Sequence, residues 1–259
     1  MGFTYYYSVV ASVVLFVGML LMIHWGRCLG KRALEKEHVS QKSGTGVIEG
    51  SVFALMGLMI AFTFSNAASR FDNRRQLIIE ESNAIGTAYH RIDLMPAEAQ
   101  PHLRDLFKKY LGLRIQIYKS LPNIEKSYQE IDQSHKLQDE IWAYTMSNIK
   151  PDTPTVVPML LLPALNQMFD IENQRNSTAS LHIPIVIVGM LFVIGLVCAL
   201  LAGFGMAESQ ARNWIYKIVF CVMTALTFYT ILDLEYPRLG FVRLDSADAT
   251  LIELLGHMK

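Results

Sequence analysis

Four polar side chains near the end of an apolar stretch are the residues of this sequence best placed to do chemistry. The stretch runs from about Val47 to Ala68, and its last two turns contain Thr63, Ser65, Asn66 and Ser69. A polar group at membrane depth must face protein or water, because lipid offers it no hydrogen-bond partner. We therefore expect these side chains either to bond to a neighbouring helix or to line a pore.

Two phenylalanines lie beside these polar residues. In a pore, a ring of such apolar side chains can gate the passage by expelling water. In an ordinary membrane helix, they would face lipid or pack against other helices. Both interpretations remain open, and the candidate residues for a pore or gate are Phe62, Phe64, Ser65, Asn66 and Ser69.

Charged residues gather where two apolar stretches end on the same side of the membrane. They are Arg70, Asp72, Arg74, Arg75, Asp233, Glu235 and Arg238. Ion pairs among them could lock two helices together at the membrane boundary. Alternatively, the charges could surround the mouth of an ion pathway, where rings of Arg favour anions and rings of Asp or Glu favour cations.

The remaining acidic and histidine residues do not form a pattern typical of a catalytic or metal site. The pair Glu80 and Glu81 has no pocket in view, and such pairs usually form ion pairs on or between helices. Asp132, His135 and Asp139 share one polar helix, but a zinc site would need a second His or a Cys. P-loop and CxxC motifs are missing from the sequence. We expect no enzyme activity, no cofactor and no bound metal.

The composition is that of a membrane protein. Hydrophobic residues make up 52% of the 259 residues, and they are concentrated in blocks. Lys plus Arg and Asp plus Glu number 23 each, and this balance argues against a nucleic-acid partner. Four blocks are long enough to cross a bilayer as helices, over residues 7–25, 47–68, 182–207 and 214–232.

The long polar region between the second and third spans is expected to be helical. Pro96, Pro122 and the loop sequence PDTPT divide it into several helices. We predict an all-α fold, a four-helix transmembrane protein with a helical bundle domain inserted between spans two and three. The expected parts are 1–68 with a basic connector over 27–45, the bundle over 69–181, and 182–259 with a short C-terminal tail.

A seven-residue pattern joins span two to the segment that follows it. Counting in sevens from Gly57 gives Phe64, Phe71, Ile78, Ile85 and Ile92. We expect one unbroken helix from Gly46 to about Leu94, roughly 70 Å long at 1.5 Å per residue. A strict seven-residue stripe predicts that this helix packs against other helices along its whole length.

The loop charges leave the orientation in the membrane open. The connector over 27–42 carries five Lys and Arg residues, which favours the cytoplasm for that side. Arginines also follow span two directly on the other side, so the balance is nearly even.

The second span and its continuation resemble the signature of the bacterial bestrophin-like membrane proteins. The matching run reads AFTFS, RFDNRR, an acidic pair, NAIGTAY and RIDLMP, and LDLEYPRLGFVRL resembles the segment after that family's last span. Bestrophins are pentameric anion channels whose second transmembrane helix lines the pore and whose soluble helices lie in the cytosol. The resemblance therefore implies that the five pore or gate candidates face a pore and that the bundle is cytoplasmic. The acidic cluster that bestrophins use for calcium is replaced by the scattered Asp245, Asp248 and Glu253.

We predict a multi-pass protein of the bacterial inner membrane that forms a homo-oligomeric ion channel, with span two lining the pore. Its partners would be the lipid bilayer, further copies of the chain in a tetramer or pentamer, and inorganic ions, with anions favoured. The alternative is a structural or signalling membrane protein whose helical bundle binds a partner or ligand. The oligomeric state in detergent separates the two, because a monomer or dimer cannot surround a pore with one span per copy.

Overall fold

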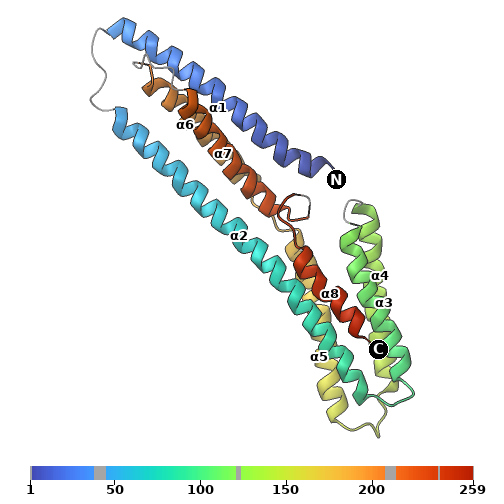
Figure 1. Cartoon of the computed structure of the whole chain (residues 1–259). Coiled ribbons are helices and arrows are strands. Elements are labelled where there is room, and N and C mark those ends of the chain that lie inside the picture. Colours follow the sequence, from blue (N-terminus) through green and yellow to red (C-terminus); the bar gives the residue numbers. More distant parts are fainter. Residues whose placement is uncertain (1, 38–44, 121–123, 208–213, 239, 259) are drawn as a thin grey trace. The chain divides into compact units, whose positions relative to one another are not determined.

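A computed structural model of the chain describes residues 2–37, 45–120, 124–207, 214–238 and 240–258. These residues form helices joined by short turns and contain no strand, which confirms the predicted all-α fold. The helices are α1 (Gly2–Glu37), α2 (Thr45–Arg91), the 3-10 helix η1 (Ile92–Leu94), α3 (Gln100–Lys119), α4 (Ile124–Asn148), α5 (Val156–Ala179), α6 (Ile185–Gly205), α7 (Trp214–Glu235) and α8 (Asp245–His257) (Figure 1). The second half of the predicted connector, Pro122 and the turn between spans three and four lie outside the described residues.

Within the described part of the chain, four helices are long and apolar enough to cross a membrane, namely α1, α2, α6 and α7. Four spans were predicted, and each coincides with one of these helices, although α6 is shorter at both ends than the predicted span over 182–207. The first span continues as helix through the first half of the predicted connector, as far as Glu37. The segment KRALEKE consists of strong helix formers, so nothing in it stops the helix.

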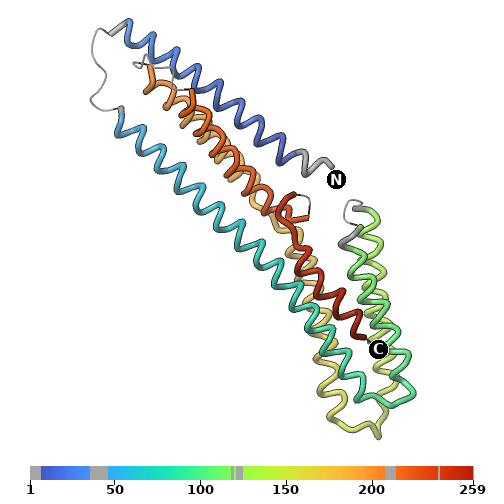
Figure 2. The backbone as a smooth tube through the Cα atoms, viewed as in Figure 1, coloured from blue at the N-terminus to red at the C-terminus, as the bar shows by residue number. Residues whose placement is uncertain are grey.

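The helix α2 is continuous from Thr45 to Arg91, and the tube in Figure 2 follows it as one unbroken coil. Its 47 residues make it about 70 Å long, as expected at 1.5 Å per residue. It contains no proline, and the first proline after it, Pro96, lies in the turn before α3. The apolar half of α2 is residues 47–68, and its charged half follows.

The chain divides into two compact units. The membrane unit comprises Gly2–Phe71 and His182–Val242. Its core joins all four spans through Leu15, Met19, Ile23, Ala67, Leu191, Ala199, Cys221, Phe228, Ile231 and Leu232. A Cβ on Gly203 would lie 2.2 Å from the backbone oxygen of Ile23, so the glycine lets the backbones of α1 and α6 touch.

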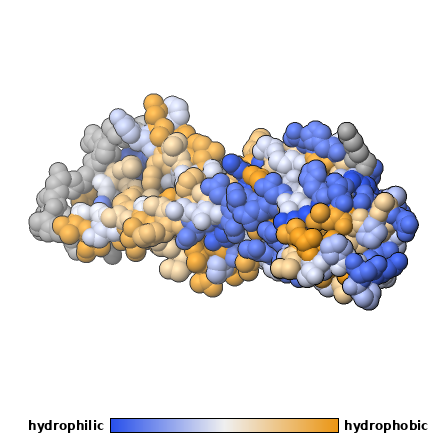
Figure 3. Space-filling model, turned by 90° about the horizontal axis from the view of Figure 1, so that it is seen from below, coloured by the Kyte–Doolittle hydropathy of each residue, from blue (hydrophilic) through white to orange (hydrophobic). Residues whose placement is uncertain are grey.

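The bundle unit comprises Asp72–Leu181 and Arg243–Lys259. It is built from the charged half of α2 with α3, α4, α5 and α8, around Leu77, Ile78, Ile85, Ile92, Leu103, Phe107, Leu111, Ile141, Leu165 and Met168. The C-terminal helix α8 belongs to this unit, where the Ser82 hydroxyl donates to the backbone oxygen of Thr250 at 3.3 Å. Hydrophobic side chains cover much of the membrane unit's visible surface in Figure 3, whereas hydrophilic ones dominate that of the bundle unit.

Candidate functional site

The polar residues of span two divide between two faces of α2. Thr63 is buried, and its hydroxyl donates to the backbone oxygen of Met59 at 2.7 Å, within the same helix. Ser65, Asn66 and Ser69 are exposed on the surface of the single chain. Three polar side chains at membrane depth therefore point away from the core of the membrane unit.

The two phenylalanines beside them lie on different faces. Phe62 is 63% exposed and Phe64 42% exposed. Phe62, Ser65 and Ser69 follow one another at spacings of three and four, so they share one face of a helix with 3.6 residues per turn. Phe64 does not share that face. The geometry thus groups Phe62 with the two serines and sets Phe64 apart.

The seven-residue stripe on α2 is buried in the bundle unit but not in the membrane half. Ile78, Ile85 and Ile92 are buried, whereas Gly57 and Phe64 are exposed. Within a single chain the stripe therefore packs in the bundle half alone, and its packing in the membrane half against helices of further copies stays a prediction. A straight α-helix drifts by about 20° per heptad from a strict seven-residue repeat, which adds up to roughly 100° over the five heptads from Gly57 to Ile92. The face that packs in the membrane half carries Met56, Thr63 and Ala67 instead.

One ion pair of the membrane-edge charge set joins α2 to α7. Arg70 Nε donates to Glu235 Oε1 at 2.7 Å, and Nη2 lies 2.6 Å from the same oxygen. The second carboxylate oxygen of Glu235 accepts the backbone N–H of Ile183 at 3.0 Å and lies 3.7 Å from His182 Nδ1. The buried Glu235 carboxylate therefore ties span four to span two and to the start of span three.

Asp233 binds the backbone of the segment that follows span four. Its Oδ2 accepts the backbone N–H groups of Phe241 at 3.1 Å and Val242 at 2.9 Å. A Cβ on Gly240 would lie 1.3 Å from the Asp233 Oδ1 atom, so only glycine allows the turn to close over this carboxylate. Asp233 is 4% exposed. Its hydrogen bonds are those of a side chain that anchors a buried turn, and they differ from what we expected of a charge at a pore mouth.

The other members of the charge set have separate surroundings. Arg74 is buried, and its Nη2 donates to the backbone oxygen of Leu181 at 2.7 Å. Asp72 and Arg75 are exposed, and Arg238 is half-buried. The structure therefore brings Arg70 and Glu235 together and leaves Asp72 and Arg75 on the surface.

A buried ionic cluster lies inside the bundle unit, and sequence reasoning missed most of it. The Glu81 carboxylate on α2 accepts Arg114 Nε from α3 at 2.6 Å and also pairs with Arg175 from α5. Glu81 and Arg114 are fully buried. Burial alone would raise the pKa of the Glu81 carboxyl, but the two guanidinium groups outweigh it and lower that pKa below its ordinary value.

Glu172 on α5 is the second carboxylate of this ionic cluster. Its side chain accepts Arg114 Nη1 at 2.8 Å, Ser134 Oγ at 3.2 Å and the Tyr110 hydroxyl at 3.3 Å, and it also accepts the Gln138 amide. Burial raises the pKa of Tyr110 well above its ordinary value, so this hydroxyl remains a neutral donor. Five helices contribute to the ionic cluster, because Arg175 also reaches Asp248 on α8 at 3.3 Å.

A periodicity signal could have revealed part of this ionic cluster. Arg114 follows the apolar residues Leu103, Phe107 and Tyr110 at helical spacing on α3, which places it on the buried face. Glu172 and Arg175 likewise continue the buried face of Leu165 and Met168 on α5. A charge at a core position predicts a buried partner, because an isolated buried charge is very costly.

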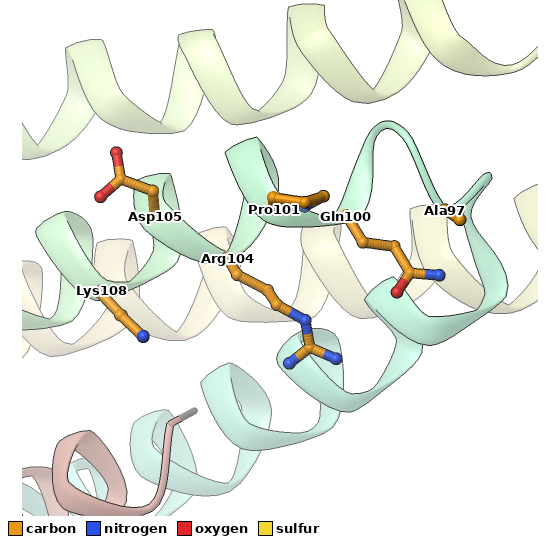
Figure 4. Close-up of a pocket in the computed structure, with 6 residues that line it drawn as sticks. All are labelled: Ala97, Gln100, Pro101, Arg104, Asp105 and Lys108. Atoms are coloured by element: carbon orange, nitrogen blue, oxygen red, sulfur yellow. The ribbon is translucent and has the colours of Figure 1, made fainter.

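The described residues contain no group of three or more His, Cys, Asp or Glu side chains that could hold a metal ion. An open hollow of about 360 Å³ lies at the start of α3 and is lined by Ala97, Gln100, Pro101, Arg104, Asp105 and Lys108 (Figure 4). Arg104 is paired with Asp93, and Asp105 lies 2.7 Å from Lys109 Nζ. In Figure 4, Asp105 points away from the side on which Arg104 and Lys108 lie. The hollow therefore does not gather convergent groups for a ligand.

Comparisons with known proteins agree with this architecture. The model of the bestrophin-like domain family matches residues 12–249. Two crystal structures of a bacterial bestrophin homologue from Klebsiella pneumoniae, each with a single mutation, are similar to this chain. One has a TM-score of 0.69 at 13% identity, over 96% of this chain and 98% of that one. The other has a TM-score of 0.66 at 12% identity, over 97% of this chain and 98% of that one.

At such identities the solved structures show a shared fold, and no curated protein sequence matches the chain. The family match covers most of the chain, including the whole of α2 and the Asp233–Val242 turn. Together with the four membrane-spanning helices, it shows that this chain is a membrane protein that belongs to the bestrophin-like family.

Proposed function

We propose that copies of this chain assemble around α2 into an ion channel of the bacterial inner membrane. The observation that carries the proposal is the exposed face of α2 formed by Phe62, Ser65 and Ser69. In the most apolar stretch of this helix only 11% of residues are buried, against 28%, 22% and 28% in α1, α6 and α7. Serine hydroxyls at membrane depth need protein or water, and a shared water-filled axis supplies both.

One helix per copy must surround the axis, so the assembly is a tetramer or pentamer. The family resemblance to bestrophins favours a pentamer and anions as the permeating ions. The exposed Asp72 and Arg75 follow on α2 beyond the membrane and would carry the charges of the pore mouth. The ion pair between Arg70 and Glu235 has a different role, which is to hold spans two and four together within each copy.

Within this channel, Phe62 is the side chain that can form an apolar constriction. It shares the face of the serines and is the more exposed of the two phenylalanines. Replacing Phe62 with Ser should hydrate the constriction and raise the conductance or open probability. Phe64→Ser is the matched control, because the residue lies on another face of the same turn.

Purified protein reconstituted into planar bilayers tests the proposal. We expect unitary currents in symmetric KCl that Phe62→Ser increases and Phe64→Ser leaves nearly unchanged. Silent bilayers containing verified oligomers, across pH and voltage, would overturn the channel proposal. The mass of the oligomer in detergent or nanodiscs should equal four or five copies.

A second candidate function has its own support in the bundle unit. This unit has a separate core and a buried ionic cluster, neither of which ion conduction requires. A structural or signalling role, in which the bundle binds a partner or ligand, would fit them. A monomer or dimer that remains folded in nanodiscs would favour this function over the channel.

A further inference from the structure

In the charged half of α2, the exposed face from Gln76 to His90 is polar and carries one half-buried carboxylate, Glu80, whose Oε1 accepts the Gln76 side-chain amide at 3.1 Å. Gln76, Asn83, Thr87 and His90 follow one another at spacings of seven, four and three, and all four are exposed. The opposite face of the same segment is buried in the bundle core through Leu77, Ala84, Ile85 and Ala88. Histidine is the side-chain type best suited to act as a pH-dependent charge near neutral pH, and this polar face contains His90.

The charged groups around His90 are already engaged with other partners. Arg91 Nη1 donates to the backbone oxygen of Leu160 at 2.5 Å. Asp93 on η1 is paired with Arg104 from α3. The imidazole of His90 has the neutral ring of Tyr89 beside it, with ring centroids 6.3 Å apart. Protonation of His90 therefore changes the charge of this face rather than the balance of an ion pair.

We infer that His90 makes the ion selectivity of the assembled channel depend on pH. The inference rests on the proposed function, because it needs the copies of α2 to converge on one axis. At acidic pH, four or five imidazolium groups would ring the pathway, attract anions and repel cations. At alkaline pH, the same ring is neutral and the charges of Asp72, Arg75 and Glu80 remain on this helix face.

The expected size of the effect follows from screened electrostatics. Charges placed about 8 Å from the axis in water at physiological ionic strength should together raise the ratio of anion to cation permeability by at least about threefold.

Reversal potentials in a KCl gradient test the inference. Wild-type channels, His90→Asn and His102→Asn should be compared at pH 5.5 and 8.0. His102 is the matched control, because it is a half-exposed histidine of the same bundle unit that lies on α3 beside Glu140. We expect a higher anion preference at pH 5.5 in the wild type and in His102→Asn, and a nearly constant preference in His90→Asn.

Three outcomes separate the inference from the function on which it rests. Conducting wild-type channels whose selectivity does not change with pH would overturn the inference alone. A pH dependence that persists in His90→Asn would overturn it as well, because another group would then be the sensor. Wild-type oligomers without current would overturn both the channel and the role of His90.

Discussion

Replacing Arg114 with Met should destabilise the bundle unit more than almost any other single substitution in it. The Arg114 side chain is fully buried and is the cation shared by Glu81 and Glu172. Without Arg114, the buried Glu172 carboxylate is surrounded by neutral hydrogen-bond donors and by the half-exposed His135, whose Nε2 lies 3.8 Å from Oε1. Removing one partner of a buried ion pair typically costs about 3–5 kcal/mol, because the other charge remains buried.

The charge balance of the ionic cluster makes the prediction sharper. Its three carboxylates, Glu81, Glu172 and Asp248, face two guanidiniums, Arg114 and Arg175. Arg114→Met leaves three negative charges against one positive charge. Glu172→Gln leaves two against two and keeps the shape of the side chain. We therefore expect Glu172→Gln to cost less than Arg114→Met, and the double variant to recover roughly 0.5–3 kcal/mol relative to the sum of the single changes.

Thermal unfolding with a probe confined to the bundle measures this effect. Of the three tryptophans, Trp142 lies on α4 in the bundle unit, and Trp25 and Trp214 belong to the membrane unit. A background with Trp25→Phe and Trp214→Phe lets fluorescence report on the bundle alone. At about 2–4 °C per kcal/mol for a protein of this size, Arg114→Met should lower the unfolding temperature by roughly 6–20 °C.

Lys109→Met is the control, because its ion pair with Asp105 on α3 is solvent-exposed and should contribute nothing measurable. The reasoning fails if Arg114→Met unfolds within 1–2 °C (about 0.5 kcal/mol) of the parent protein. It fails equally if Glu172→Gln proves the more damaging change.

Three further predictions concern other contacts. Gly240→Ala should reduce the yield of monodisperse protein in size-exclusion chromatography, because the added Cβ would overlap the Asp233 carboxylate. Gly256→Ala is the control and should be tolerated, because its Cβ would meet no atom within 4 Å. Arg74→Ala should impair assembly or conductance more than Arg104→Ala does. The first change removes a buried hydrogen bond to the backbone oxygen of Leu181, whereas the second removes an exposed ion pair with Asp93. Equal effects of the two changes would contradict this prediction. Because the folded-state pKa of Glu81 is lowered, its stabilising contribution is present above the ordinary value of 4.5 and lost as pH falls through the folded value. The unfolding temperature reported by Trp142 should therefore change little from pH 7 to 5 and drop at lower pH.

Local sequence patterns were sufficient to predict the helices and spans. Apolar length marked four spans, and Pro96 and the PDTPT loop marked the ends of bundle helices, because both signals depend on neighbouring residues alone. The prediction of an unbroken α2 held for the same reason. The end of α1 was missed, because a charged segment of good helix formers reads equally well as a connector or a helix.

The partners of individual side chains could not be predicted in the same way. Glu81 was assigned only as a surface or interhelical pair, because its guanidinium partners lie 33 and 94 residues away in the sequence. Asp233 and Glu235 looked alike as charges that follow span four. Asp233 anchors a backbone turn, whereas Glu235 binds an arginine. Only the path of the chain around Gly240 gives these two carboxylates different partners.

The two halves of α2 differ in whether one copy of the chain gives all of their side chains suitable surroundings. In the bundle half the polar face can meet water, and the apolar face is already buried, so that half is complete without further copies. In the membrane half, Ser65 and Ser69 would have lipid as their surroundings, which offers their hydroxyls no hydrogen-bond partner outside their own helix. Gly57 has no atom within 4 Å of an added Cβ, so no contact inside the single chain explains the glycine. If copies of α2 approach closely there, Gly57→Leu should leave the chain folded yet disrupt the oligomer, because small residues permit close helix packing in membranes. Unchanged oligomer mass in Gly57→Leu would show that this face of α2 does not form the contact between copies.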